Sequence, residues 1–286
     1  MYVPPTSAPA RAPDSLLLVT WNQGIGAGDL ARLVRDARAG RLTGGARPRA
    51  LVLLLQEAHR VGAAVPPVSE LPDGWRGGDA PDEGYAHDIV AAARDLGMHL
   101  VYAPSMRTGT TPAADRGNAI LSDLPLRDPV AIELPIGLQR RVAVLARLAA
   151  LPACARAASV HLDNFGWSHP IGSMGAIRAA QARALVAALP ADGALAVGGD
   201  LNTWRRETDA QAARILARAL PQPRVHEPEW TAVRLGSPRK LDYLFFRGPT
   251  GWRLADPDAV ESYGSDHRAV VAWLTVPAGT AHASCS

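Results

Sequence analysis

The feature that most constrains the fold of this chain is a series of short apolar runs, each followed at once by a polar residue. The first two runs, residues 16–21 (LLLVTW) and 50–55 (ALVLLL), have the length and continuity of strands covered on both faces. Between them, residues 29–39 carry Leu30, Leu33 and Val34 at helical spacing. The chain therefore opens as strand, helix, strand.

The rest of the chain continues this mixture with a strand-rich middle. A Pro- and Gly-rich stretch at 65–84 predicts a surface loop, and residues 85–96 predict a helix that leads into a strand at 99–103. Residues 117–162 alternate β-like runs with turn residues, and helices at 174–189 and 210–220 and strands at 194–197, 241–246 and 270–276 complete the order. This order predicts an α/β fold: a four-layer sandwich of two mixed β-sheets packed face to face, with helices on the outside.

Composition indicates one folded domain. Hydrophobic residues make up 48% of the 286, enough for one large core. We expect a flexible Pro- and Ala-rich lead-in at 1–14, a domain at 15–276 and a tail at 277–286. The start lacks a secretory pattern and no run approaches 18 apolar residues. We therefore expect a monomer of the cytoplasm without a transmembrane segment, or a secreted protein if a leader has been removed.

Charge and cysteine content exclude few functions. The formal net charge is +3, which suits an anionic substrate. Lys240 is the only lysine among the 30 Lys and Arg residues. Codon bias explains this high arginine content better than a phosphate site does. Cys154 and Cys285 are too few for a disulfide scaffold or a thiolate metal site. No histidine pair has the spacing of a zinc motif, and the glycines of GIGAG (24–28) predict a turn rather than a dinucleotide loop.

Polar residues with metal-binding or acid–base chemistry stand where the apolar runs stop. Singly, such residues cap helices or form turns. Together they predict one cleft built from several strand ends. They are Asn22, Glu57, His161, Asp200 with Asn202, Asp242, and Asp266 with His267.

The motifs around these residues resemble those of the endonuclease/exonuclease/phosphatase superfamily, which includes deoxyribonuclease I-like, exonuclease III-like and sphingomyelinase-like hydrolases. The motifs occur in the order T-W-N, L-Q-E, G-N-A-I-L-S, V-H-L-D, G-G-D-L-N-T, L-D-Y-L-F and S-D-H-R-A-V. The likeness extends from Leu16 to about Val276, and G-D-x-N followed by S-D-H is its most specific part.

The resemblance implies a Mg²⁺ cofactor, or Mn²⁺ in its place, for in-line attack of water on a phosphoric ester. Glu57 would be the principal metal ligand with Asn22 beside it, and Asp266 would lie at the metal and water side. Asp200 would hold or deprotonate the attacking water, and Asn202 would orient that water and the phosphate.

The resemblance also implies a set of proton donors and phosphate-binding groups. His267 would donate to the phosphoryl oxygens, and Asp242 would accept its other ring proton; the alternative for Asp242 is an ordinary salt bridge to Arg239 or Lys240. His161 would be a second catalytic donor. Arg116 would bind phosphate, and so would one of Arg140 and Arg141, with Arg141 favoured because strand alternation turns only one of them to the site.

The sequence departs from the family pattern near His161. In deoxyribonuclease I a glutamate pairs with the matching histidine, whereas residues 102–107 (YAPSMR) contain no carboxylate. Asp163 or another group is expected to take its place. The tyrosine that exonuclease III-like enzymes hold near the leaving group is not assigned.

The leading hypothesis is therefore a metal-dependent phosphodiesterase or nuclease. Its substrate would be a phosphate ester, with nucleic acid as the first candidate because the chain is mildly basic. The alternatives are a phosphatase or phosphodiesterase for a phospholipid or small metabolite, and a non-catalytic binding module that keeps the fold.

Overall fold

The computed structural model describes residues 1–4, 13–62, 87–107, 114–137, 139–164, 173–203, 210–223, 230–234 and 236–277. The predicted surface loop at 65–84, most of the lead-in and nearly all of the tail lie outside these ranges. Within the lead-in, Tyr2 exchanges two backbone hydrogen bonds with Leu100. The domain boundaries stay a prediction.

The larger sheet has the strand order β12-β14-β1-β2-β4-β3, with β13 also paired to β14. Only β1 and β2 run parallel, because α1 connects them; the other pairs are antiparallel. Its strands are β1 (Ser15–Asn22), β2 (Leu51–Val61), β3 (His99–Arg107), β4 (Ala114–Ser122), β12 (Arg253–Leu254), β13 (Asp258–Ala259) and β14 (Val270–Thr275).

The second sheet has the order β11-β8-β7-β6-β5. Its one parallel pair, β7 and β8, is joined through α3. Its strands are β5 (Leu126–Glu133), β6 (Val142–Leu148), β7 (Arg156–His161), β8 (Leu195–Asp200) and β11 (Asp242–Arg247). A separate two-stranded hairpin is made of β9 (Ala232–Arg234) and β10 (Ser237–Arg239).

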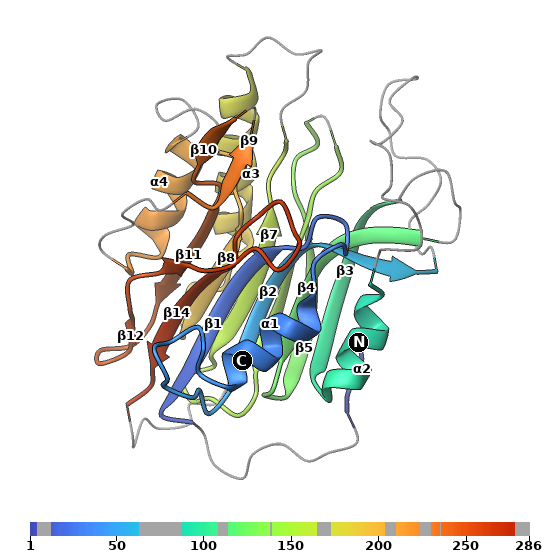
Figure 1. Cartoon of the computed structure of the whole chain (residues 1–286). Helices are drawn as coiled ribbons and strands as arrows, with labels where there is room; N and C mark the ends of the chain where they lie inside the picture. Colours follow the sequence, from blue (N-terminus) through green and yellow to red (C-terminus); the bar gives the residue numbers. More distant parts are fainter. Residues whose placement is uncertain are drawn as a thin grey trace.

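Four helices cover the outer faces of the two sheets (Figure 1). Helices α1 (Leu30–Arg38) and α2 (Ile89–Leu96) share an apolar cluster with the outer face of the larger sheet. Helices α3 (Ser173–Ala188) and α4 (Ala210–Ala219) do the same for the second sheet. A third cluster fills the space between the sheets. The predicted four-layer α/β sandwich is confirmed, and none of the described helices is long and apolar enough to cross a membrane.

Several sequence-based boundaries are wrong: β3 and β8 extend beyond the predicted ends at 103 and 197, and the second strand and second helix differ as well. The second strand does not stop before Glu57 but continues to Val61, because the strand accommodates an extra residue and goes on pairing with β4. Helix α2 begins at Ile89 rather than at residue 85, because the Asp88 carboxylate accepts the Ala91 N–H at 2.7 Å and so caps the helix there. The short strands β9, β10, β12 and β13 were not predicted.

Candidate functional site

The strands of the second sheet bring three of the predicted residues into one row. His161 pairs with Asp200 across β7 and β8, and Asp200 pairs with Asp242 across β8 and β11. Each of the three lies on the interior face of its strand, since side chains two or four residues away on the same face, namely Ala157, Ala196 and Leu244, belong to the core between the sheets. All three are buried, so a polar row closes one end of the apolar interior.

The larger sheet contributes Asn22 and Glu57 to the same end. Asn22 is the last residue of β1, buried, and its Nδ2 donates to Asp200 Oδ2 at 3.0 Å. Glu57 lies at a β-bulge, where Gln56 and Glu57 together oppose the single residue Asn118 of β4. Glu57 takes a φ of +50°, and its Oε1 lies 3.9 Å from His161 Nδ1 on the facing sheet.

Asp200 is the centre of the arrangement. Its Oδ1 accepts the Asn202 backbone N–H at 2.8 Å, and its Oδ2 lies 3.4 Å from His161 Nε2 and 3.8 Å from His267 Nε2. Burial raises the pKa of the Asp200 carboxyl well above its usual range; the His267 charge opposes this, and the Asp242 charge adds to it. The Asp200 carboxyl group therefore has a pKa of about 7, close to neutral pH.

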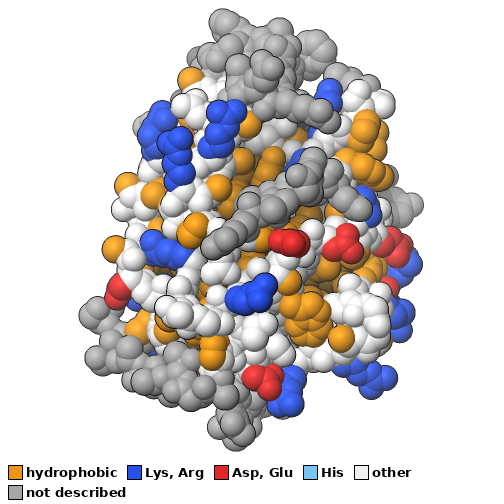
Figure 2. Space-filling model, turned by 90° about the vertical axis from the view of Figure 1, so that its left-hand side faces the viewer, with side chains coloured by type: hydrophobic (Ala, Val, Ile, Leu, Met, Phe, Trp, Pro, Cys, Tyr) orange, Lys and Arg blue, Asp and Glu red, His pale blue; other side chains and the backbone are white. Residues whose placement is uncertain are grey.

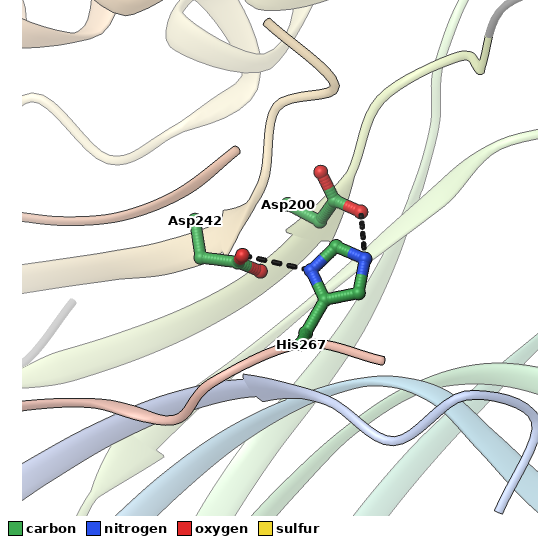
Figure 3. Close-up of side chains that lie close together, drawn as sticks. All are labelled: Asp200, Asp242 and His267. Atoms are coloured by element: carbon green, nitrogen blue, oxygen red, sulfur yellow. Dashed lines mark hydrogen bonds and ion pairs between the residues drawn. The ribbon is translucent and has the colours of Figure 1, made fainter. Parts of the chain in front are cut away.

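The His267 ring lies between two carboxylates, as Figure 3 shows. Its Nδ1 is 2.8 Å from Asp242 Oδ2, and its Nε2 points toward Asp200. Burial by itself lowers the pKa of His267, but the charges of Asp242 and Asp200 and the Asp242 hydrogen bond raise it to about 10. The imidazole is therefore a cationic donor at neutral pH. The hydrogen bond to Asp242 matches the predicted pairing.

His161 has a different environment. Asn202 Nδ2 lies 3.0 Å from both His161 Nε2 and the Leu162 carbonyl oxygen, so its two hydrogens can be donated one to each. That arrangement makes Nε2 an acceptor and leaves the ring proton on Nδ1, the nitrogen nearer Glu57. Glu57, Asp200 and Asn202 therefore surround His161.

Asp163, the partner expected for His161, is buried beside Arg141: its Oδ1 lies 3.6 Å from Arg141 Nε. Arg141 is itself 2% exposed. Burial lowers the pKa of Arg141, while the charges of Asp163, Glu57 and Asp200 oppose that change and the charge of Arg116 adds to it. Arg141 is thus a buried cation close to the carboxylates, and Arg116 is a second buried cation near it.

Arg140 takes the other direction. Its Nη1 donates to the carbonyl oxygens of Pro104 and Ser105, and its Nη2 pairs with Glu133. Strand alternation therefore separates the two adjacent arginines as predicted, and it is Arg141 that faces the site.

Asp266 lies at the exposed rim of the site. A side-chain carbon added at Gly24, in the turn after β1, would lie 3.4 Å from Asp266 Oδ1. Beside it, Ser265 Oγ donates to the Asn22 carbonyl oxygen at 2.7 Å and accepts the His267 N–H at 3.1 Å. Asn22 and Asp266 are therefore neighbours although they are far apart in sequence.

The donor set fits a divalent cation. Glu57, Asn22 and Asp266 carry hard oxygen atoms, the kind of ligand that Mg²⁺ requires; Asp266 is exposed and Asn22 is buried. Asp200, Asp242 and His267 also have ligand atoms within 4.8 Å of one another. In that group, however, the His267 imidazole already donates to Asp242. The three residues are therefore better described as a hydrogen-bonded acid–base unit than as a set of metal ligands.

Sequence reasoning missed several polar residues that support the site. Thr231 Oγ1 accepts the N–H groups of Leu241 and Asp242, and Trp21 Nε1 donates to the His267 carbonyl oxygen at 3.1 Å. Thr20, Gln56 and Ser159 form a buried polar layer under the site. The sequence does contain a signal for this layer. Thr20 and Ser159 are polar residues at interior strand positions, and the interior residues that precede them are apolar.

The fold and the arrangement of polar strand ends define a two-sheet α/β protein with an acid–base centre at one end of the sandwich. The sequence matches the model of the Endonuclease/Exonuclease/phosphatase family over residues 19–267, so the chain belongs to that family. Membership supports a hydrolase of phosphoric esters. A comparison with curated proteins finds no match.

Similar solved structures bear out the fold. An endonuclease/exonuclease/phosphatase protein from Beutenbergia cavernae is 20% identical with a TM-score of 0.59, covering 92% of this chain and 72% of its own. The human Nocturnin catalytic domain with bound sulfate is 18% identical with a TM-score of 0.55, covering 95% and 100%. A humanized D. rerio TDP2 is 15% identical with a TM-score of 0.54, covering 92% and 100%.

Proposed function

We propose that the chain is a Mg²⁺- or Mn²⁺-dependent hydrolase of phosphodiesters, with nucleic acid as the first candidate substrate. The observation that carries the proposal is the meeting of Glu57, from the larger sheet, with His161 and Asp200, from the second. Two carboxylates, one from each sheet and each within 4 Å of the His161 ring, next to the buried Arg141, suit a charged phosphate ester better than a neutral ligand.

Each side chain has a role that its surroundings support. Asp200, with its raised pKa, is suited to take a proton from the attacking water, and Asn202 is suited to orient that water and the phosphate. His267, protonated and held by Asp242, is suited to donate to the phosphoryl oxygens as their charge grows. His161 is suited to act as a second donor through the Nδ1 proton.

The phosphate would be held between the two sheets. Arg116 and Arg141 are buried and positively charged, and Arg141 interacts with the charges of Glu57, Asp200 and Arg116, so the two guanidinium groups can bind its oxygens. A divalent cation bound by Glu57 and Asn22, with Asp266 on its water side, would supply further neutralisation of the phosphate charge.

Charge supports a polyanionic substrate. The net charge is +3, and on the face shown in Figure 2 one group of Lys and Arg side chains lies at the upper left, while other basic side chains and the acidic ones are spread over the rest of that face. A nucleic acid would bind more weakly as salt rises, because binding releases counterions.

Glu57→Gln tests the proposal. The change removes one negative charge at nearly constant size, so it should lower turnover of bis-p-nitrophenyl phosphate by at least about 100-fold and weaken Mn²⁺ binding, with the fold intact. Glu133→Gln, at an exposed carboxylate of β5, is the matched control and should leave both unchanged. Full turnover of Glu57→Gln at saturating Mg²⁺ would contradict the assignment.

A substrate panel separates the alternatives. Plasmid DNA, RNA, sphingomyelin, inositol phosphates and bis-p-nitrophenyl phosphate are each incubated with Mg²⁺ and with EDTA. We expect EDTA-sensitive cleavage that is fastest for nucleic acid. Preferred cleavage of a lipid or inositol phosphate would support the phospholipid or metabolite enzyme, and Mn²⁺ binding without cleavage of any substrate would support the binding module.

A further inference from the structure

One layer of side chains separates the candidate site from the apolar core between the sheets. On β1, β2 and β7 the interior positions just below the site are Thr20, Gln56 and Ser159, all of them fully buried. The interior positions below these, such as Val52 and Leu54 on β2, belong to the apolar cluster. Burying a polar layer costs free energy unless its hydrogen bonds are satisfied.

The Gln56 amide forms hydrogen bonds with the other polar groups of this layer and so links the two sheets. Its Nε2 donates to Ser159 Oγ on the facing sheet at 2.9 Å and to the Leu54 carbonyl oxygen of its own strand at 2.9 Å, and it lies 3.2 Å from Thr20 Oγ1. Ser159 Oγ in turn donates to the Leu55 carbonyl oxygen at 2.8 Å. Two hydrogen bonds therefore cross from β7 to β2 directly beside the bulge.

Glu57 depends on that bulge to face the site. Leu53, Leu55 and Ala58 pack in the outer cluster, and in an unbroken strand Glu57 would alternate to the same outer side. The extra residue in β2 turns Glu57 inward, at a φ of +50° that side-chain-bearing residues seldom adopt. Such a conformation persists only where the surroundings hold it.

We propose that Gln56 is a positioning residue: its hydrogen bonds to Ser159 and to the Leu54 carbonyl hold the bulge that directs Glu57 into the cleft, and they set the spacing between Glu57 and His161. The inference rests on the proposed function, in which Glu57 holds the cation. Gln56 touches neither the substrate nor the cation and acts through its neighbour.

The test is Gln56→Met, which keeps the length and burial of the side chain and removes the amide. Mn²⁺ binding is measured without substrate, from the free Mn²⁺ signal in electron paramagnetic resonance. We expect the dissociation constant to rise by about 10- to 100-fold, the usual effect of losing a group that orients a metal ligand.

Val52→Ala is the matched control, since Val52 lies on the same strand and the same face, two interior positions below Gln56. It should lower the thermal unfolding midpoint and leave the Mn²⁺ dissociation constant within about twofold of the unaltered protein. Unchanged Mn²⁺ binding in Gln56→Met, or equal weakening in Val52→Ala, would overturn the inference. If the unaltered protein binds no Mn²⁺, it is the proposed metal dependence that fails.

Ser159→Ala provides a second route if Gln56→Met does not fold. It removes the hydrogen bonds across the sheets and keeps the Gln56 amide, so it should weaken Mn²⁺ binding in the same direction. The double variant should bind Mn²⁺ about as weakly as Gln56→Met alone, because residues of one network are not additive. If the two losses of Mn²⁺ affinity multiply in the double variant, or if Ser159→Ala binds Mn²⁺ with full affinity, the two residues do not act together.

Discussion

The chemistry of single residues is set by what surrounds them, and His267 and His161 show this most directly. His267 has a carboxylate on each side of its ring and is held as a cation. His161 accepts from an amide at Nε2 and keeps its proton on the other nitrogen. Two histidines, one at the end of β7 and one in the loop before β14, are thereby suited to different parts of one reaction.

The pairing of His267 with Asp242 leads to a pH prediction. The raised pKa of His267 keeps the ring protonated until the pH approaches about 10, so an alkaline limb of activity is expected there. Asp242→Asn removes the charge that raises this pKa. Activity should fall by about 100-fold or more, and the alkaline limb should move to lower pH, as measured by turnover between pH 6 and 10.

His267→Ala and the double variant supply the control for this experiment. His267→Ala should cost at least as much as Asp242→Asn, and the double variant should be little worse than His267→Ala, because the two residues act as one unit. If the two losses multiply, the acid–base pair does not exist as a unit.

The raised pKa of His267 also affects the stability of the fold. A histidine whose pKa is raised by folding stabilises the folded state fully below its ordinary pKa, and this contribution is lost as the pH rises toward 10. Urea unfolding at pH 6 and pH 9.5 should show a smaller fall in the free energy of unfolding for His267→Ala than for the unaltered protein. Equal falls would mean that the ring is not held as a cation.

At the scale of strands and helices, apolar runs were enough to predict most elements. Buried strands in parallel pairs, such as β1 and β8, contain continuous apolar runs, LLLV and LAV, which stand out in the sequence. The short strands β9, β10, β12 and β13 have two or three residues each and carry no periodicity to detect. They exist because neighbouring chain segments offer them partners.

The candidate site was predictable in part for the same reason. Asn22, His161, Asp200 and Asp242 stand at the ends of recognisable strands, so their meeting follows from the topology. Glu57 is different, because alternation along β2 places it on the wrong face and no local pattern reveals a bulge. The partnership of Asp163 with Arg141 depends on a contact between chain segments that sequence spacing does not encode.

The glycine pair of β8 leads to a prediction about this element. A Cβ on Gly199 would lie 1.9 Å from the Val160 carbonyl oxygen of β7, whereas one on Gly198 would meet the ends of side chains such as Leu54, at 2.7 Å. Gly199→Ala should therefore separate the strands that carry His161 and Asp200 and destabilise the fold by several kcal/mol, about 3 or more.

Gly198→Ala is the internal comparison, because two of the three atoms it would meet are methyl ends of Leu54 and Leu244, which can shift, and none is a backbone atom. Thermal unfolding of both variants measures the difference, with a lower midpoint expected for Gly199→Ala. Equal midpoints would contradict the backbone clash as the cause.

For the whole molecule, the candidate site exists only where the two sheets meet. Asn22 and Glu57 come from one sheet, and His161, Asp200 and Asp242 come from the other. Packing of the two sheets against each other therefore positions the site. Substitutions at the far end of this interface should nevertheless affect only the stability of the fold.

Leu16→Ala tests that separation, since Leu16 is fully buried at the start of β1, three interior positions below Asn22. The cavity should lower the free energy of unfolding by about 2 to 5 kcal/mol. Turnover of the folded variant, measured well below its unfolding midpoint, should stay within about twofold of the unaltered value. A large loss of turnover would mean that the whole interface, and not its polar end, sets the geometry.

The position of β1 between β2 and β14 also governs when the site can form during synthesis. β1 leaves the ribosome well before its antiparallel neighbour β14, which is made some 250 residues later, after the loop that carries Asp266 and His267. Contacts between such distant segments close slowly. A nascent chain that already contains Asn22, Glu57 and Asp200 therefore still lacks His267, and the pairing of His267 with Asp242 can form only after the loop before β14 has been made.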